Sequence, residues 1–234
     1  MNKFILAFIM FFVMISASLA DSNVYITQSG ASLDLDITMD GNNNAVGAAN
    51  DRTLLTGANL DVDIDLIGAS NVITGDFIGA GESGADDLKI NQTGSTNTTA
   101  LNIGSSAATD DVSIIENRTG SSGVTSYLVG SAATVQDVSI TVDVVGDDID
   151  IAISEQSTST GSDKTTDIDI GTDSDDVDII ITHTGAGAHK TKLLCTGSCA
   201  GSDFTMSQTG VNSTNVDLIV TNATSSDVDI TITE

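Results

Sequence analysis

The sequence predicts an all-β protein, and within that class a β-solenoid made of stacked strand-turn-strand repeats. Three observations predict it: apolar and polar residues alternate, glycine closes most alternating stretches, and similar stretches recur along the chain. Successive side chains of a strand point to opposite faces, so each stretch has one apolar face. Stacked copies can bury such faces against one another. A β-sandwich with regularly spaced strands is the alternative architecture.

The stretch Asp86–Gly104 shows the repeat most clearly. Leu88 and Ile90 share one face of a first strand, residues 93–96 supply turn chemistry, and a second alternating strand follows. The first strands of four such units start from anchor residues spaced 28, 24 and 26 residues apart, which is a degenerate period. These anchors are Leu60, Leu88, Val112 and Val138.

Similar alternation predicts strands along the remaining chain, and no helix signal follows the N-terminal segment. No domain boundary is convincing, so residues 21–234 are expected to form a single solenoid domain, with Gln156–Thr166 as the best candidate for a break. The other predicted strands lie at Ser22–Gln28, Leu33–Met39, Val46–Ala48, Leu60–Leu66, Val72–Gly79, Val112–Gly120, Val124–Gly130, Val138–Val142, Ile149–Ile153, Ile168–Ile170, Val177–Ile181, Lys192–Gly197, Phe204–Gln208, Val216–Val220 and Val228–Ile232.

Composition supports the all-β class and restricts the partners. The 234 residues include 33 acidic ones, of which 29 are Asp, and neither Pro nor Trp is present. Asp, Thr, Ser, Gly, Val and Ile are poor helix formers, and the abundance and patterning of the apolar residues argue against disorder. A formal net charge of −26 argues against nucleic acid and against anionic membrane surfaces as partners.

The first twenty residues, Met1–Ala20, read as a secretory signal peptide. Lys3 gives a positive start, an apolar run follows, and small residues precede a cleavage site between Ala20 and Asp21. A membrane anchor is the alternative, but the apolar run is short for a span. We therefore expect an extracellular or cell-surface protein that has no membrane contact once the signal is removed.

Several units resemble the curlin repeat of curli-type functional amyloid, which reads Ser-x5-Gln-x4-Asn-x5-Gln with Gly two residues after the first Gln. Ser22-x5-Gln28 and Ser202-x5-Gln208 reproduce its first half, with Gly30 and Gly210 in place; Asp86-x5-Gln92-x4-Asn97 and Met39-x4-Asn44 match in part, with Gly94 and Gly41 in place. The resemblance implies a secreted β-solenoid that polymerises into extracellular fibres. Inward amides could then stack as hydrogen-bonded ladders along the axis. The residues expected in these ladders are Gln28, Asn44, Gln92, Asn97 and Gln208.

The chain departs from this pattern in several places. Asp110-x5-Glu116 has neither Ser nor Gln, Leu33 stands at an Asn position, and residues 124–183 match by alternation only. Glu116 and Glu155 are lone acids in strand context, and both are expected to be exposed.

These observations favour a non-enzymatic fibre subunit that mediates adhesion and self-assembly. A solenoid with uncovered ends offers unpaired backbone groups to another copy, and the last strand, Asp227–Glu234, carries neither Pro nor Lys. No catalytic triad, nucleophile elbow or phosphate-binding motif is present. The alternative is a calcium-stabilised monomeric adhesin or surface-binding module, with an ice-binding solenoid and a secreted hydrolase as more distant readings.

Alternating aspartates are the only candidate ligands for calcium. Asp61, Asp63 and Asp65 should lie on an outer strand face, where rows on neighbouring strands could share hard cations. No glycine-framed calcium loop is present, and a solvated acidic face that keeps the protein soluble is the simpler interpretation.

Cys195 and Cys199 are the only cysteines and should form a local disulfide, because a secreted chain meets oxidising conditions. The alternative is a tetrahedral zinc site that adds the upstream His183 and His189. The spacing H-x5-H-x5-C-x3-C matches no standard zinc finger closely.

Overall fold

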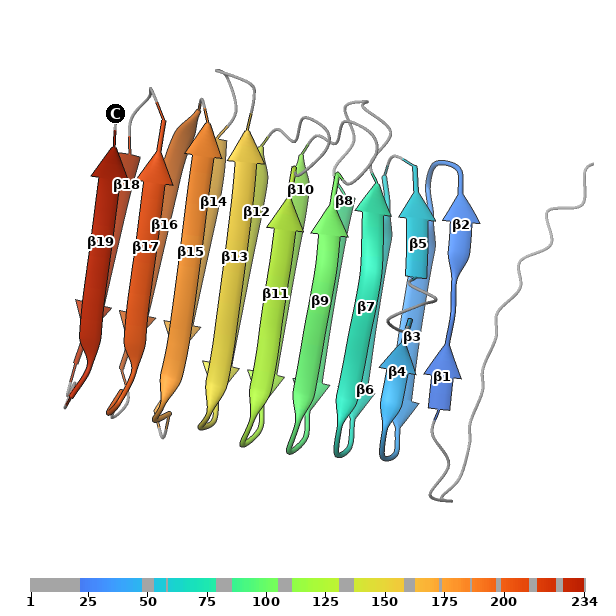
Figure 1. Ribbon diagram of the computed structural model, residues 1–234. Helices are drawn as coiled ribbons and strands as arrows, with labels where there is room; N and C mark the ends of the chain where they lie inside the picture. The colour runs from blue at the N-terminus through green and yellow to red at the C-terminus, as the bar shows by residue number, and fades with distance from the viewer. Residues whose placement is uncertain are drawn as a thin grey trace, which may run out of the picture.

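The protein is a stack of β-arches in which two sheets face each other (Figure 1). The computed structural model describes residues 22–47, 53–57, 59–78, 86–104, 111–130, 137–157, 163–172, 174–185, 187–196, 199–210, 214–221 and 225–233. Within these ranges the chain forms 19 strands and no helix. None of the described residues belongs to a helix of the length and apolarity needed to cross a membrane.

The strands fall into two sheets, and the chain alternates between them. The eight-stranded sheet contains β3 (Asp34–Asp40), β6 (Asp61–Ile67), β8 (Asp86–Thr93), β10 (Val112–Thr119), β12 (Val138–Val145), β14 (Asp163–Ile170), β16 (Ala188–Cys195) and β18 (Thr214–Val220). The eleven-stranded sheet contains β1 (Ser22–Val24), β2 (Thr27–Ser29), β4 (Asn44–Val46), β5 (Thr53–Thr56), β7 (Asn71–Ile78), β9 (Asn97–Ile103), β11 (Gly123–Val129), β13 (Ile149–Ser157), β15 (Val177–Gly185), β17 (Asp203–Thr209) and β19 (Asp227–Thr233).

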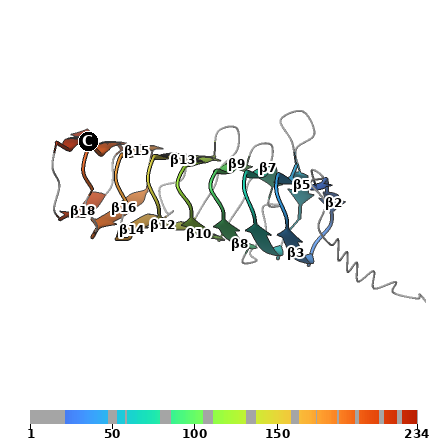
Figure 2. The same ribbon diagram turned by 90° about the horizontal axis from the view of Figure 1, so that it is seen from below.

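Every strand pairing in the described chain is parallel. From β6 to β19, consecutive strands lie in opposite sheets (Figure 2). Each strand from β6 to β17 pairs with strands one turn earlier and one turn later, whereas β18 and β19 pair only with the preceding turn. Parallel pairing at a distance of one full turn is the geometry of a β-solenoid. The predicted fold class is therefore confirmed, and the β-sandwich alternative is excluded because its consecutive strands would pair antiparallel.

The register gives a stricter period than the sequence suggested. Val62, Leu88, Ile114 and Ile140 are successive partners in the eight-stranded sheet, each 26 residues from the next. The uneven spacing of the predicted anchors comes from Leu88, because the register partner of Val112 in β8 is Asp86, two residues before Leu88. Leu60 lies 26 residues before Asp86, and Val138 lies 26 residues after Val112.

The core is a thin aliphatic layer between the two sheets. Isoleucine, valine and leucine at alternate strand positions are almost fully buried, as in Ile140, Ile151 and Val177. Tyr127 is the only fully buried phenylalanine or tyrosine among the side chains that the structure describes. An apolar interior of this kind forces any polar side chain at an inward position to find a partner inside.

Neighbouring turns lie in close contact at the glycine corners. At Gly94 and at Gly120, a Cβ atom would coincide with the carbonyl oxygen of the corner glycine one turn earlier. A side chain therefore has no room at these positions, which explains why glycine closes the alternating stretches of the sequence.

Both sheets run without interruption from the first turns to the last. The predicted break at Gln156–Thr166 is bridged on one side by pairing of β13 with β15 and on the other by pairing of β12 with β14. The predicted signal peptide and its cleavage site at Ala20 and Asp21 lie outside the described residues.

Candidate functional site

Three asparagines form an axial amide ladder inside one corner of the solenoid. The side-chain amide of Asn44 donates to Oδ1 of Asn71 over 3.0 Å, and that of Asn71 donates to Oδ1 of Asn97 over 3.0 Å. All three side chains are buried, and each also donates to the carbonyl of the glycine three residues earlier. Asn44 and Asn97 were expected in such a ladder; Asn71, which links them, was not.

The ladder stops one turn later because the next partner of Asn97 is Gly123. The guanidinium of Arg118 occupies this space, and a Cβ atom on Gly123 would lie 2.5 Å from Arg118 Nη1. Because Gly123 has no side chain, the guanidinium of Arg118 fits where a further asparagine of the ladder would otherwise lie.

The three predicted glutamines do not stack on one another. Gln28 and Gln208 lie in the eleven-stranded sheet and Gln92 lies in the other sheet. The axial partners of Gln92 are Leu66 and Arg118. The buried amide of Gln92 reaches across the core, accepting a hydrogen bond from Thr99, whereas Gln28 is half-buried and donates to the Gly30 carbonyl.

A buried cluster around Glu116 joins the two sheets near the middle of the stack; we call it the Glu116 cluster (Gln92, Thr99, Glu116, Arg118, Thr125, Tyr127). Glu116 Oε1 accepts from Arg118 Nη2 and from Thr99 Oγ1, both over 2.8 Å. Its Oε2 accepts from Tyr127 over 2.7 Å and from Thr125 over 3.0 Å. Both carboxylate oxygens therefore have two donors each, and burial next to the Glu116 carboxylate raises the pKa of Tyr127 well above its ordinary value.

A second buried cluster lies two turns further along; we call it the Glu155 cluster (Glu155, Lys164, Thr166, His183, His189, Thr191, Gln208). Glu155 Oε2 lies 3.0 Å from His183 Nε2, and the rings of His183 and His189 stack with centroids 5.0 Å apart. Gln208 Nε2 lies 3.1 Å from His183 Nδ1 and donates to Thr191. The seven side chains are at most 2% exposed.

Burial shifts the basic groups of the Glu155 cluster toward their neutral forms. Desolvation lowers the pKa of Lys164, although the nearby Glu155 carboxylate acts in the opposite direction. Desolvation and then the adjacent His183 ring lower the pKa of His189. The His189 ring therefore favours its unprotonated form, in which it can bind a cation.

The prediction that Glu116 and Glu155 are exposed was wrong, because both side chains have 0% exposure. The sequence contained the signal for their burial: Glu116 follows Val112 and Ile114 at period two, and Glu155 follows Ile151 and Ile153. Their strand parity places them on the inward face. The charge of the two residues suggested exposure, whereas their alternate positions in the strands place them in the core. The clusters around both residues were therefore not predicted.

The alternating aspartates project outward and lie in register. Asp34, Asp61 and Asp87 are successive partners on the outer face of the eight-stranded sheet. Desolvation and the neighbouring Asp63 and Asp34 carboxylates raise the pKa of Asp61, as expected for like charges on adjacent strands. Asp65 of the same strand accepts a hydrogen bond from Asn91, so part of the acidic face is tied into an outer amide row.

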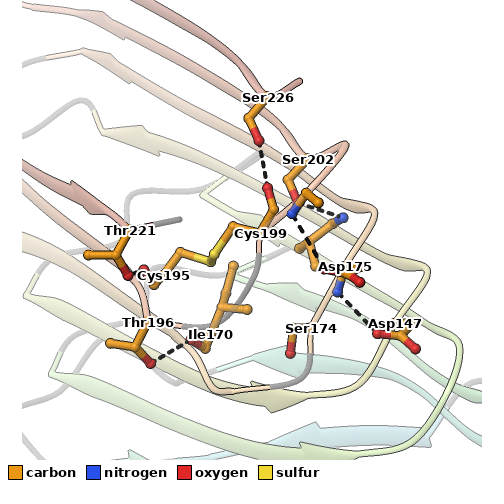
Figure 3. Close-up of a disulfide and its surroundings, with 12 residues drawn as sticks. Asp147, Ile170, Ser174, Asp175, Cys195, Thr196, Cys199, Ser202, Thr221 and Ser226 are labelled. Carbon is orange, nitrogen blue, oxygen red and sulfur yellow. Dashed lines mark hydrogen bonds between the residues drawn. A yellow bond between two sulfur atoms is a disulfide. The ribbon is translucent and has the colours of Figure 1, made fainter. Parts of the chain in front are cut away.

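The two cysteines form a disulfide that closes the connection between β16 and β17 (Figure 3). Both residues are buried, and neighbouring turns hold their backbone: Cys199 N–H donates to Ser174 O, and Thr221 Oγ1 donates to Cys195 O. His189 lies at the other end of β16, about 20 Å away at 3.3 Å per residue. The oxidised sulfurs and this distance separate the cysteines from the histidines, so the four residues predicted as a zinc site do not converge.

The last described turn leaves apolar side chains uncovered. Val228, Ile230 and Ile232 of β19 pair in register with the inward Phe204, Met206 and Gln208 of β17. The three β19 side chains are nevertheless 41%, 44% and 47% exposed, whereas Phe204 and Met206 are at most 6% exposed. Nothing in the described chain lies beyond β18 and β19, so an inward-type face meets solvent there.

No family model, no curated protein and no solved structure matches the chain.

Proposed function

We propose that this chain is a secreted, non-enzymatic fibre subunit that self-assembles end to end into an extracellular matrix or surface appendage and mediates adhesion there. The observation that carries the proposal is the uncovered face of β19, where three aliphatic side chains at inward positions are 41–47% exposed. Covering them with the first turn of another copy would continue both parallel sheets and remove apolar area from water.

The opposite end of the stack offers a matching surface. Val24, Ile26 and Leu35 lie at the edge formed by the first strands and are only partly buried against the core. Such ends are complementary because each carries half of the same interior, and association of unlike ends gives an open filament rather than a closed dimer. The resemblance of several units to the curlin repeat supports the same role.

The acidic outer faces fit this proposal as a brake on side-by-side association. Asp150, Asp178, Asp203 and Asp227 are consecutive partners along the outer face of the eleven-stranded sheet. Like charges in register repel approaching copies on these faces and leave the apolar inward-type side chains at the ends as the favoured contact.

Ile230→Lys tests the end contact by placing a charge in the uncovered face. The matched control is Ile180→Lys on the outer face of β15, since Ile180 is an equally accessible isoleucine, 52% exposed, within the stack. Negative-stain electron microscopy and thioflavin kinetics should show fibres for the wild type and for Ile180→Lys. For Ile230→Lys we expect a lag at least tenfold longer, or no fibres.

Two results would contradict the proposal. Equal assembly of the two lysine variants would remove the role of the β19 face. A wild-type protein that stays monomeric by light scattering at high concentration would favour the monomeric adhesin, and a calcium-dependent rise in melting temperature at matched ionic strength would then indicate that calcium stabilises it.

A further inference from the structure

We infer that Glu155, His183 and His189 form a buried site for a divalent transition-metal ion, with Zn²⁺ as the best-suited ion, inside the solenoid. One ligand atom from each of these residues lies within 4.8 Å of the other two, and all three residues are buried. They come from β13, β15 and β16, so a bound ion would join the two sheets. The inference does not depend on fibre formation, since a monomer would carry the same site.

The residue types suit zinc. Imidazole and carboxylate are zinc ligands, and two histidines with one glutamate, plus a fourth position, make a recurring zinc ligand set. Calcium and magnesium prefer all-oxygen shells, so they fit this site poorly. The chain has only two histidines, and the fold stacks both of them in this cluster from opposite sheets.

Glu155 and His183 bring two potential metal-ligand atoms together. Glu155 Oε2 lies 3.0 Å from His183 Nε2, yet this carboxylate oxygen has no hydrogen-bond partner. Neighbouring ligand atoms of a tetrahedral zinc site with bonds of 2.0–2.2 Å stand roughly 3.4 Å apart. A small adjustment of the two side chains would therefore let both atoms face one ion.

His189 brings an unsatisfied nitrogen to the same place. Its Nδ1 has no hydrogen-bond partner although the side chain is only 1% exposed, and its Nε2 lies 3.5 Å from the Gly185 carbonyl. A buried polar atom without a partner costs free energy, which a metal bond would recover. Metal-ligating histidines usually donate their other ring N–H to a carbonyl, and Gly185 O is placed to accept it.

Gln208 can serve His183 in the same way. Its amide lies 3.1 Å from His183 Nδ1, and its own Oε1 has no partner. Rotation of the amide by 180° would let the oxygen accept from Nδ1–H, which leaves the Nε2 lone pair of His183 for the metal. Thr166 Oγ1, 3.3 Å from both Glu155 Oε1 and His183 Nε2, offers a nearby oxygen for the fourth position.

Refolding in the presence of metal provides the test, because the buried ligands are accessible only while the chain folds. The full chain is refolded with ZnCl2, or with CoCl2 as a spectroscopic probe, dialysed against metal-free buffer, and assayed for bound metal. We expect one zinc per chain, the visible absorption of tetrahedral Co²⁺, and a melting temperature raised by roughly 5–10 °C at a hundredfold excess of zinc over its Kd. CaCl2 at the same concentration should give none of these effects.

Two variants identify the site. His189→Leu should lose the bound zinc and the rise in melting temperature, while Asp178→Asn, on the outer face of the same strand as His183, should keep both. A double Cys195→Ser, Cys199→Ser variant should also keep the zinc, because the cysteines lie outside the cluster. Absence of retained metal in the wild type, or equal retention by His189→Leu, would overturn the inference.

Discussion

Glu116 and Glu155 are both buried inward-facing acids, but the partners that compensate them differ in kind. Glu116 accepts four hydrogen bonds, one of them from Arg118, whose charge is permanent under all ordinary conditions. Glu155 is surrounded by Lys164, His183 and His189, which can each lose a proton, and one of its oxygens accepts no hydrogen bond. The same residue type at the same kind of position therefore gives a fixed polar network in one place and an adjustable one in the other.

The difference teaches that burial alone does not define a structural charge. The Glu116 carboxylate has all four of its acceptor positions filled by donors from both sheets, so it has no free lone pair for a ligand. An unsaturated network of titratable groups retains the capacity to bind a proton or a metal ion. Three predictions test whether the two clusters differ in this way.

The largest expected effect is a difference in the loss of unfolding free energy between Glu116→Gln and Glu155→Gln. The first variant leaves Arg118 as an uncompensated buried charge, and we expect a loss of about 3–5 kcal/mol in the free energy of unfolding. The second should cost about 1 kcal/mol in metal-free protein, the value of one exchanged hydrogen bond. Urea denaturation of both variants measures the two losses. Equal losses would show that the networks do not differ as described.

The donors beside the two acids give the next contrast. Tyr127→Phe removes the hydroxyl that donates to Glu116 over 2.7 Å and should cost about 1.5–3 kcal/mol, as expected for a hydrogen bond to a charged group. His189→Leu removes a ring whose Nδ1 has no partner and should change the free energy of unfolding by about 1 kcal/mol or less in either direction. Denaturant midpoints at one pH measure both effects, and a larger loss for His189→Leu would reverse the comparison.

The smallest expected effect is on how the free energy of unfolding changes with pH, and it depends on His189 in the Glu155 cluster. The groups that face His189 are Glu155, Lys164 and His183, and burial with His183 lowers the pKa of His189 below its ordinary 6.5. A histidine whose folded pKa is lowered destabilises the fold when the unfolded chain can be protonated. Its contribution is therefore fully favourable above pH 6.5 and is lost as the pH falls below that value.

We expect the free energy of unfolding of the metal-free wild type to fall below pH 6.5 more steeply than that of His189→Leu, by up to about 1.4 kcal/mol per pH unit. Denaturation at pH 7.5, 6.5 and 5.5 with constant salt measures the difference between the two proteins. Subtraction removes the opposite contribution of outer aspartates such as Asp143 and Asp178, whose raised pKa values make acid stabilising. Parallel pH profiles would mean that His189 does not titrate in this environment.

The sequence was sufficient for the fold class and for most strands, because alternation, turn residues and glycine corners are local signals. Alternation placed Val112–Thr119 and Phe204–Gln208 correctly to within a few residues. The 26-residue period was obscured because Leu88 was taken as an anchor in place of Asp86, the register partner of Val112, whereas register is set by the corners. The missing link of the amide ladder, Asn71, lies at such a corner, three residues after Gly68.

The polar clusters could be predicted only in part. Alternation along the strand is enough to predict that Glu116 and Glu155 face the core. No local pattern predicts which residue of the opposite sheet faces them. His183 and His189 are six residues apart in the chain, yet their stacking depends on a turn that carries the chain from one sheet to the other. Such contacts across the core are set by the three-dimensional path of the chain rather than by periodicity.

The short step of 22–28 residues between partner strands bears on how the chain reaches its folded state. Each strand needs only the preceding turn as a template, so winding can begin at whichever end is free and proceed one coil at a time. A polypeptide threaded through a narrow pore could therefore wind on the far side before its remainder has emerged. Every completed coil would then hinder backsliding, and the folding free energy would help to draw the chain outward.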